Sequence, residues 1–266
     1  MKRTHFLIAI SVLMMSMASC QKEEDTIQDS TPEPAPTPTI GHFAISPTRQ
    51  VILSPGNVQY CPATKEWRFA PHQYDIVGES NLQSNDIYEG WVDLFQWGSG
   101  SCPTLYTDDL EPFSSFHDWG ENFEGGWRTL DETEADYLLL KRPKHDNLCV
   151  PATVCGITGL VLLPDDWDGP ALQPMGWSSR YESNTYDADS WRAMEMKGAI
   201  FLPAAGGIDG DEMVYAQIKG HYWVKCAPPT PTYSFVRSFT FDATSITEQA
   251  ARFVLRRSVR LAKDVE

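Results

Sequence analysis

Proline and glycine divide this chain into short apolar runs, which limits the length of any helix or strand that it forms. The 266 residues include 19 Pro and 18 Gly. Between residues 42 and 70, runs of alternating apolar residues are separated by Pro47, by Pro55-Gly56 and by Pro62. A period of two is typical of strands that bury one face, and such breakers mark turns. We therefore predict an antiparallel meander built from HFAIS, QVILS, NVQYC and EWRFA.

Two further kinds of strand are indicated later in the chain. ITGLVLLP and GAIFLPAAG are continuous apolar runs bounded by Gly and Pro, a pattern of strands buried on both faces. RSFTF and RSVRLA, near the end of the chain, alternate like the first four runs.

Two segments carry helix signals among these strands. Thr129 and Glu132 predict a capping box at the start of a helix over residues 130–142. Asp189 predicts the N-cap of a shorter helix over DSWRAMEMK, whose buried side carries Trp191. Strands with two helices between them predict an α+β domain of mainly short antiparallel strands and long loops.

The first nineteen residues have the three parts of a secretory signal. A basic head is followed by an apolar run, and the small residues Ala18 and Ser19 precede Cys20. The apolar run is shorter than the roughly 20 residues that a membrane-spanning helix needs. We therefore predict a signal peptide over residues 1–19.

The residues around Cys20 resemble the lipobox of bacterial lipoproteins, here MASC. The resemblance implies that Cys20 becomes an N-terminus that carries acyl chains such as palmitate and anchors the protein to a membrane. QKEED, which starts one residue later, resembles a sorting signal for the outer face of the outer membrane. Together they imply a lipid-anchored, surface-exposed outer-membrane protein. The alternatives are an ordinary cleaved signal and a solvated charge run at the start of a linker.

A proline-rich linker is predicted over residues 20–40. Prolines at every second position from Pro32 to Pro38 favour polyproline II, which acts as a semi-rigid spacer of about 3.1 Å per residue. No second break of this kind follows. Residues 41–266 are therefore predicted to form one domain, a length that supports a sizeable core.

The charge balance excludes one class of partner. The net charge is −15, and removing Lys2 and Arg3 with the signal makes it −17. Binding to nucleic acid depends on basic side chains that neutralise phosphates. We therefore expect no nucleic-acid partner.

Five cysteines follow the linker, an odd number whose pairing the sequence leaves open. Disulfides are permitted outside the inner membrane. No C-x-x-C or H-x-x-x-H pair accompanies these cysteines, so no zinc site is predicted. They are Cys61, Cys102, Cys149, Cys155 and Cys226.

The sequence carries no recognisable catalytic or cofactor motif. G-x-S-x-G, H-E-x-x-H, P-loop and G-x-G-x-x-G patterns are absent. Ser115, His117 and Asp118 are interpreted as ordinary loop residues, because neighbours in sequence rarely form a triad. Asp187 with Asp189 does not extend to a calcium loop. We predict no catalytic residue, no metal and no cofactor.

A succession of aromatic and glycine motifs runs through the domain. The motifs are VILSPGNVQY, YEGWVDLFQWGSG, GWRTLDETEADYLLLKR, GITGLVLLPDDW, MEMKGAIFLPAAG, GHYW and SVRLAKD. Together they span nearly the whole chain from Phe43 on. This order is similar to a family of bacterial surface lipoproteins related to the fibrobacter-type major paralogous domain. The resemblance implies a C-type-lectin-like fold of the formylglycine-generating-enzyme type, with its N- and C-terminal strands paired.

The segment over residues 165–190 is the predicted binding loop. It is rich in Pro, Gly, Ser, Asp and aromatics and has no strong period, and loops on a rigid scaffold commonly bind ligands. The alternative is that it only packs over the domain. The candidate ligand-binding residues are Trp177, Arg180, Tyr181, Asn184 and Tyr186. Most other tryptophans are predicted to pack in the core; they are Trp67, Trp91, Trp97, Trp127 and Trp223.

These observations predict a surface-anchored binding or adhesion module for a glycan or a protein. The alternative is a structural or accessory subunit of a larger surface assembly. An enzyme of the formylglycine-generating type would depend on cysteine chemistry, and Cys226 has no partner cysteine at a suitable spacing. We therefore predict no enzymatic activity.

Overall fold

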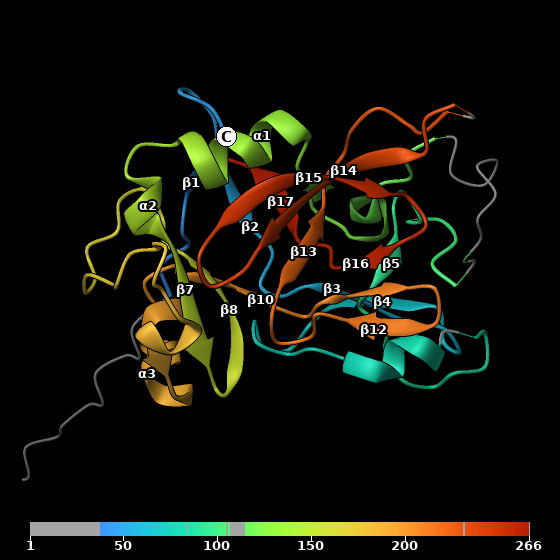
Figure 1. Cartoon of the computed structure of the whole chain (residues 1–266), viewed down its shortest axis with the longest axis horizontal. Coiled ribbons are helices and arrows are strands. Elements are labelled where there is room, and N and C mark those ends of the chain that lie inside the picture. Colours follow the sequence, from blue (N-terminus) through green and yellow to red (C-terminus); the bar gives the residue numbers. More distant parts are fainter. Residues whose placement is uncertain (1–37, 84, 105, 107–114, 231, 266) are drawn as a thin grey trace, which may run out of the picture. The chain divides into compact units, whose positions relative to one another are not determined.

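The structure is a computed structural model that describes residues 38–83, 85–104, 106, 115–230 and 232–265. These residues belong to one unit, Thr37–Glu266. Short, mostly antiparallel strands form five sheets, and a few short helices lie around them (Figure 1). The predicted α+β class is therefore confirmed. The predicted signal peptide, Cys20 and nearly all of the predicted linker lie outside the described residues.

The two ends of the domain meet in one sheet with the order β1-β2-β17-β6. β17 pairs antiparallel with β2 on one side and with β6 on the other. The predicted pairing of the terminal strands is confirmed. The strands are β1 (Phe43–Ala44), β2 (Gln50–Leu53), β6 (Arg128–Thr129) and β17 (Leu261–Asp264).

The predicted meander over residues 42–70 is wrong in its central connection. β1 and β2 form one hairpin, and β3 (Val58–Cys61) and β4 (Glu66–Phe69) form another. β2 does not pair with β3, because its second edge is occupied by the distant β17. Two hairpins in different sheets therefore replace one meander.

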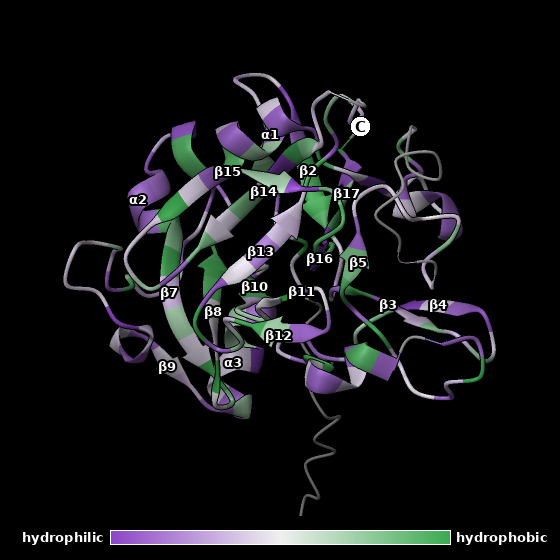
Figure 2. Cartoon of the chain, turned by 45° about the vertical axis from the view of Figure 1, so that its right-hand side comes forward, coloured by the Kyte–Doolittle hydropathy of each residue, from purple (hydrophilic) through white to green (hydrophobic). Residues whose placement is uncertain are grey.

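A second sheet has the order β10-β8-β7-β9 and carries the continuous apolar runs. Helix α3 (Ala188–Glu195) packs on it through Trp191 and Met194, which lie in one cluster with Val161 and Phe201. The predicted burial of β8 and β10 is confirmed, and Figure 2 shows β8 as largely hydrophobic. The strands are β7 (Cys149–Val154), β8 (Ile157–Leu162), β9 (Thr185–Tyr186) and β10 (Ile200–Pro203).

The remaining strands form a four-stranded sheet β12-β11-β16-β5 and a three-stranded sheet β13-β14-β15. RSVRLA, expected to be one strand, is divided between β16 and β17. The strands are β5 (Phe95–Gln96), β11 (Gly207–Asp209), β12 (Glu212–Val214), β13 (Gly220–Trp223), β14 (Phe235–Phe241), β15 (Ile246–Arg252) and β16 (Arg256–Arg257).

Both predicted helices form, but each begins at a different cap. Asp131 caps the first helix and makes a capping box with Glu134. Thr129 is not the cap, because it belongs to β6 and its hydroxyl donates to Asp118 at 2.8 Å. Asp187, not Asp189, caps the second helix.

The helices are short. They are α1 (Glu132–Asp136), continued by the π-helical turn η4 (Tyr137–Lys141), α2 (His145–Leu148) and α3 (Ala188–Glu195). The 3-10 turns are η1 (Gly78–Gln83), η3 (Trp119–Asn122) and η5 (Tyr181–Ser183).

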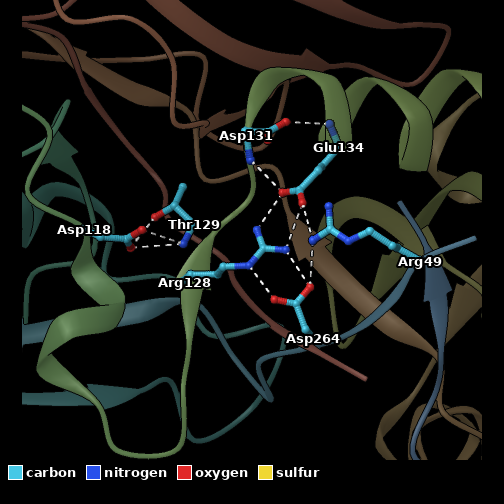
Figure 3. A network of polar contacts seen from close by, with 7 residues as sticks. All are labelled: Arg49, Asp118, Arg128, Thr129, Asp131, Glu134 and Asp264. Carbon is cyan, nitrogen blue, oxygen red and sulfur yellow. Dashed lines mark hydrogen bonds and ion pairs between the residues drawn. The ribbon is translucent and has the colours of Figure 1, made fainter. Parts of the chain in front are cut away.

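An ion-pair network fastens the sheet in which the termini meet (Figure 3). Arg128 of β6 donates to both carboxylate oxygens of Glu134 at 2.6 and 2.9 Å, and to Asp264 of β17 at 2.8 and 2.9 Å. Arg49 contacts the same two carboxylates, each at 3.0 Å. Hydrogen bonds from Arg128 lower the pKa of Asp264 to about 2. Every charge in this network has a partner, so its role is structural.

The tryptophans predicted to lie in the core divide into two groups. Trp97 and Trp223 are buried, as predicted. Trp67, Trp91 and Trp127 are only half-buried. Trp67 and Trp127 still pack against the core cluster that contains Trp97, as predicted. Trp91 lies outside the core clusters of the described residues, and its ring stacks on the Arg68 guanidinium.

Three properties concern the described residues as a whole. Their five cysteines are free, which leaves no disulfide among them. No helix in this part of the chain is long and apolar enough to cross a membrane. The same part contains no group of three His, Cys, Asp or Glu side chains able to hold a metal ion.

Candidate functional site

The predicted binding loop over residues 165–190 turns two of its five candidate residues inward. The Tyr181 ring is only 8% exposed in the main core, and its hydroxyl donates to the Ile218 carbonyl at 2.8 Å. Burial also raises the pKa of this hydroxyl. The Asn184 amide is buried as well and donates to the carbonyls of Pro151 and Gln173 at 2.8 and 3.0 Å. Neither residue is available to a ligand, which corrects that part of the prediction.

The other three candidates do not converge. Trp177 is 93% exposed, and Arg180 is exposed as well. Tyr186 is half-buried because its ring packs edge-on against Trp191, with 5.9 Å between the ring centres. The loop therefore offers one isolated exposed aromatic side chain rather than a shaped site.

A groove with converging aromatic and polar side chains lies elsewhere, beside the β3–β4 hairpin. Its volume is about 520 Å³. One wall comes from β3 and β4, one from the segment over residues 71–91, and Ile157 at the start of β8 closes one side. The groove residues used below are Gln59, Arg68, Tyr74, Asp75, Tyr88 and Trp91.

Arg68 and Trp91 form the most defined part of this groove. The Arg68 guanidinium lies 3.6 Å from the centre of the Trp91 ring, and its Nε donates to Gln59 Oε1 at 2.9 Å. Stacking on an aromatic face and a hydrogen bond to a buried amide together fix the orientation of the guanidinium. The groove thus presents a cation and an aromatic ring that are both positioned in advance.

Tyr74 and Tyr88 supply two more aromatic side chains. Tyr74 stacks on His72, with ring centres 5.1 Å apart, and packs against the core cluster under β7 and β8. Tyr88 packs against the cluster that contains Val92. Both tyrosines are half-buried, so each is held by the core on one side and open to solvent on the other.

The segment over residues 71–91 has little regular structure, and two buried amides fix it in place. Asn81 Oδ1 accepts hydrogen bonds from the backbone N–H groups of Asp93 and Leu94 at 2.7 and 3.0 Å, and its Nδ2 donates to Asp93 Oδ1 at 2.8 Å. Gln73 accepts from the backbone of Phe201 and donates to the carbonyl of Ala199 at 3.2 Å. The groove wall is therefore anchored in the core at two points.

Two carboxylates of different character lie near the groove. Asp93 is fully buried and accepts from the Val77 N–H at 3.0 Å; burial raises its pKa to about 6. Asp75 lines the groove and accepts from the backbone of His72 at 2.9 Å, so it offers an acceptor to a ligand.

The polar groups that line the groove are of several kinds. They are a guanidinium, an amide, a carboxylate and the hydroxyls of Ser80, Tyr74 and Tyr88, and none of these hydroxyls has a histidine beside it in the lining. Ser115 and His117 do contact each other at 3.2 Å, but the Asp118 carboxylate accepts from Thr129 instead. The interpretation of these three as loop residues therefore agrees with their geometry.

Sequence reasoning missed this groove, although one signal was present. Residues 71–91 contain Tyr74, Tyr88 and Trp91 among Pro, Gly, Ser and Asn, the same composition that singled out the predicted binding loop. Arg68 and Gln59 carried no such signal, because only strand pairing places them at the groove: they lie opposite each other in the β3–β4 hairpin.

Comparison with known proteins identifies no relative that could explain this groove. No protein-family model matches the chain, and neither a curated protein nor a solved structure matches it. The function is therefore inferred from the residues themselves.

Proposed function

We propose that this protein is a lipid-anchored surface module that binds a glycan in the groove of Arg68, Tyr74, Tyr88 and Trp91. The observation that carries the proposal is the convergence of three half-buried aromatic side chains with a fixed guanidinium and a carboxylate. It is a binding protein, not an enzyme, and needs no metal or other cofactor.

The chemistry of a sugar ring matches this groove. A pyranose has an apolar face of C–H groups, which stacks on an aromatic ring, and a rim of hydroxyls, which donate and accept hydrogen bonds. Trp91 and the tyrosines supply the rings; Asp75 accepts, and Arg68 donates. The volume of about 520 Å³ lies within the roughly 300–1,000 Å³ of small-ligand sites.

Rigidity also supports binding. Ordering a mobile loop on binding costs free energy, and a groove that is already held in place avoids much of that cost. Asn81 and Gln73 anchor the wall formed by residues 71–91 in the free protein. The anchored wall therefore favours a ligand that is recognised without rearrangement.

The fold and the expected localisation of the protein complete the proposal. A C-type-lectin-like fold agrees with the pairing of terminal strands β2 and β17 and with the long irregular segments. Acyl chains on Cys20 would anchor the protein to the outer membrane. The charge run over residues 21–25 and the proline-rich linker would hold the domain away from that membrane. Replacing Cys20 with Ala should release the protein from membranes, and protease added to intact cells should cleave the original chain.

Two binding screens test the proposal. The full chain in detergent is applied to an array of neutral and acidic oligosaccharides and, in parallel, to an array of unstructured peptides. We expect binding to a related set of oligosaccharides and to no peptide set. Binding to peptides alone would indicate that the ligand is a protein and not a glycan. A chain that binds neither array but co-purifies with one surface protein would instead be a subunit of an assembly.

A further inference from the structure

A second cavity, beyond the proposed glycan groove, lies between the β11–β12 hairpin and the β13–β14–β15 sheet. Its volume is about 160 Å³. The share of liquid volume of one water is about 30 Å³, so the cavity holds a small ion with a few waters but no oligosaccharide. The residues that carry the argument are Asp209, Lys219, His221, Thr240, Arg256 and Arg257.

The lining of this cavity is cationic in an otherwise acidic protein. Lys219, Arg256 and Arg257 line it together with one carboxylate, that of the exposed Asp209. The whole chain carries 36 Asp and Glu against 21 Lys and Arg. Lys219 and Arg257 outnumber the single carboxylate of the lining even when Arg256 is left out, and this local excess of positive charge needs a specific explanation.

The environment of Arg257 is the strongest evidence for an anion site in this cavity. Arg257 is only 6% exposed, it lies 5.0 Å from the centre of the Trp223 ring, and one of its Nη atoms donates to the Ser238 hydroxyl. Among the described residues no carboxylate lies within ion-pair distance of Arg257 or Lys219. Buried arginines are normally paired, because an isolated charge is costly to remove from water.

The other buried arginines have carboxylate, amide or backbone acceptors in the described residues. Arg142 is fully buried, and its guanidinium donates to Asp165 at 3.0 Å and to the Leu163 carbonyl at 2.9 Å. Arg256 has backbone acceptors, the carbonyls of Gly210 and Asn81 at 3.1 and 3.4 Å. Arg260 is buried without a carboxylate as well, but its guanidinium donates to the amide oxygens of Asn57 at 3.3 Å and Gln73 at 2.8 Å, whereas the described acceptor of Arg257 is a hydroxyl.

The titration behaviour of the cavity agrees with an incomplete counter-charge, because Asp209 acts to raise the pKa of Arg257 but burial outweighs it. Burial and the nearby charges of Arg257 and Lys219 lower the pKa of His221 to about 3, and burial lowers the pKa of Arg257 to about 10. Both shifts disfavour the cationic form of the group. The facing titratable groups are Asp209, Tyr215, Lys219 and Arg256.

Neutral polar groups complete the lining. His221 Nδ1 lies 2.8 Å from Thr240 Oγ1, and the Thr240 hydroxyl donates to Gln249 Oε1 at 3.1 Å. These contacts fix the His221 ring at the wall of the cavity. Its resonances therefore report on any ion that enters.

We propose that this cavity binds one oxyanion, a sulfate, phosphate or carboxylate group, between Arg257 and Lys219. A guanidinium binds such groups through two parallel N–H···O bonds, and a lysine ammonium adds a point charge. The anion supplies the counter-charge that the chain itself does not place beside Arg257.

A titration followed by NMR tests this proposal on the full chain in detergent. The His221 ring and Arg257 guanidinium signals are recorded against sodium sulfate, phosphate and acetate, with ionic strength held constant by sodium chloride. A sulfated monosaccharide and glucuronic acid are titrated separately. We expect saturable shifts with at least one probe. Saturation by an inorganic ion or acetate assigns the site to a free anion, and saturation by the sugars alone assigns it to an acidic sugar.

Three variants decide whether the cavity is responsible. Arg257→Met should weaken binding at least tenfold, and Lys219→Met should weaken it by a smaller factor. Arg180→Met removes an exposed charge that does not line the cavity, so its affinity should equal that of the original chain. If Arg257→Met does not fold, the affinity of Lys219→Met is compared with those of the original chain and Arg180→Met. The absence of saturable binding for every probe, or equal affinity of the original chain and Lys219→Met, would overturn the proposal.

Discussion

Two irregular segments of this domain have similar compositions and similar anchors, yet only one of them builds a groove. Residues 71–91 are held by the buried amide of Asn81, and residues 165–190 by the buried amide of Asn184. The first segment leaves Tyr74, Tyr88 and Trp91 half-buried around a groove, whereas the second buries Tyr181 and leaves Trp177 alone in solvent.

The difference lies in what each segment packs against. Residues 71–91 lie beside the β3–β4 hairpin, which adds Arg68 and Gln59 to the aromatic side chains. Residues 165–190 cover a sheet and insert Tyr181 into the core. An anchored loop thus becomes a candidate binding site when a neighbouring element supplies polar groups of its own.

The largest expected effect comes from removing the anchor of the first segment. Asn81→Ala should lower the free energy of unfolding by about 4 kcal/mol, because it removes a hydrogen bond to the buried Asp93 carboxylate and leaves two backbone N–H groups without a partner. Urea unfolding measures this loss. Asn85→Ala, at an exposed position of the same segment, is the control and should cost less than about 1 kcal/mol. Equal losses in the two variants would show that Asn81 is not an anchor.

The pH dependence of the free energy of unfolding should also distinguish the two segments. The pKa of Asp93 in the folded state is raised to about 6, above its unfolded value, so the folded state takes up a proton first as the pH falls from 7 to 4. This uptake should stabilise the original chain relative to Asp93→Asn by about 2–3 kcal/mol over that range, nearly all of it gained before the unfolded pKa is reached. Unfolding curves of both chains at several pH values measure the difference. A difference that is the same at pH 7 and pH 4 would contradict burial of this carboxyl.

The anchor of the second segment should have a smaller effect. Asn184→Ala removes uncharged hydrogen bonds to Pro151 and Gln173, so we expect a loss of about 2 kcal/mol. Because its partners do not titrate, this loss should be the same at pH 7 and pH 5. The groove beside β3 and β4 should keep its ligand affinity. Loss of that affinity in Asn184→Ala would mean that the two segments are coupled.

The sequence predicted those elements whose signals are local. The buried strands β8 and β10 follow from continuous apolar runs, and both longer helices follow from their spacing and charged ends. The helix caps were misplaced by two residues, because two capping residues compete at each start. Pairing of β6 with β17 removes Thr129 from that competition, and this contact is distant in the sequence.

Non-local packing explains what the sequence could not predict. The pairing of β2 with β17 replaced the expected meander, and only the family resemblance pointed to it. The candidate groove combines Gln59, Arg68 and Ile157 with residues 71–91. Composition identifies an irregular aromatic segment, but it does not show which of its rings turn toward the core. Tyr181 was assigned to the binding loop but is buried, and Trp91 was assigned to the core but lines the groove.

One paired measurement tests the central claim, that ligand binding belongs to the first segment and not to the second. Trp91→Ala and Trp177→Ala are compared with the original chain for affinity to the oligosaccharide that binds best on the array, after circular dichroism has shown that both are folded. We predict that Trp91→Ala loses at least tenfold in affinity, which corresponds to about 1.4 kcal/mol, while Trp177→Ala binds like the original chain. Unchanged affinity in Trp91→Ala together with a loss in Trp177→Ala would contradict the account and return the site to residues 165–190.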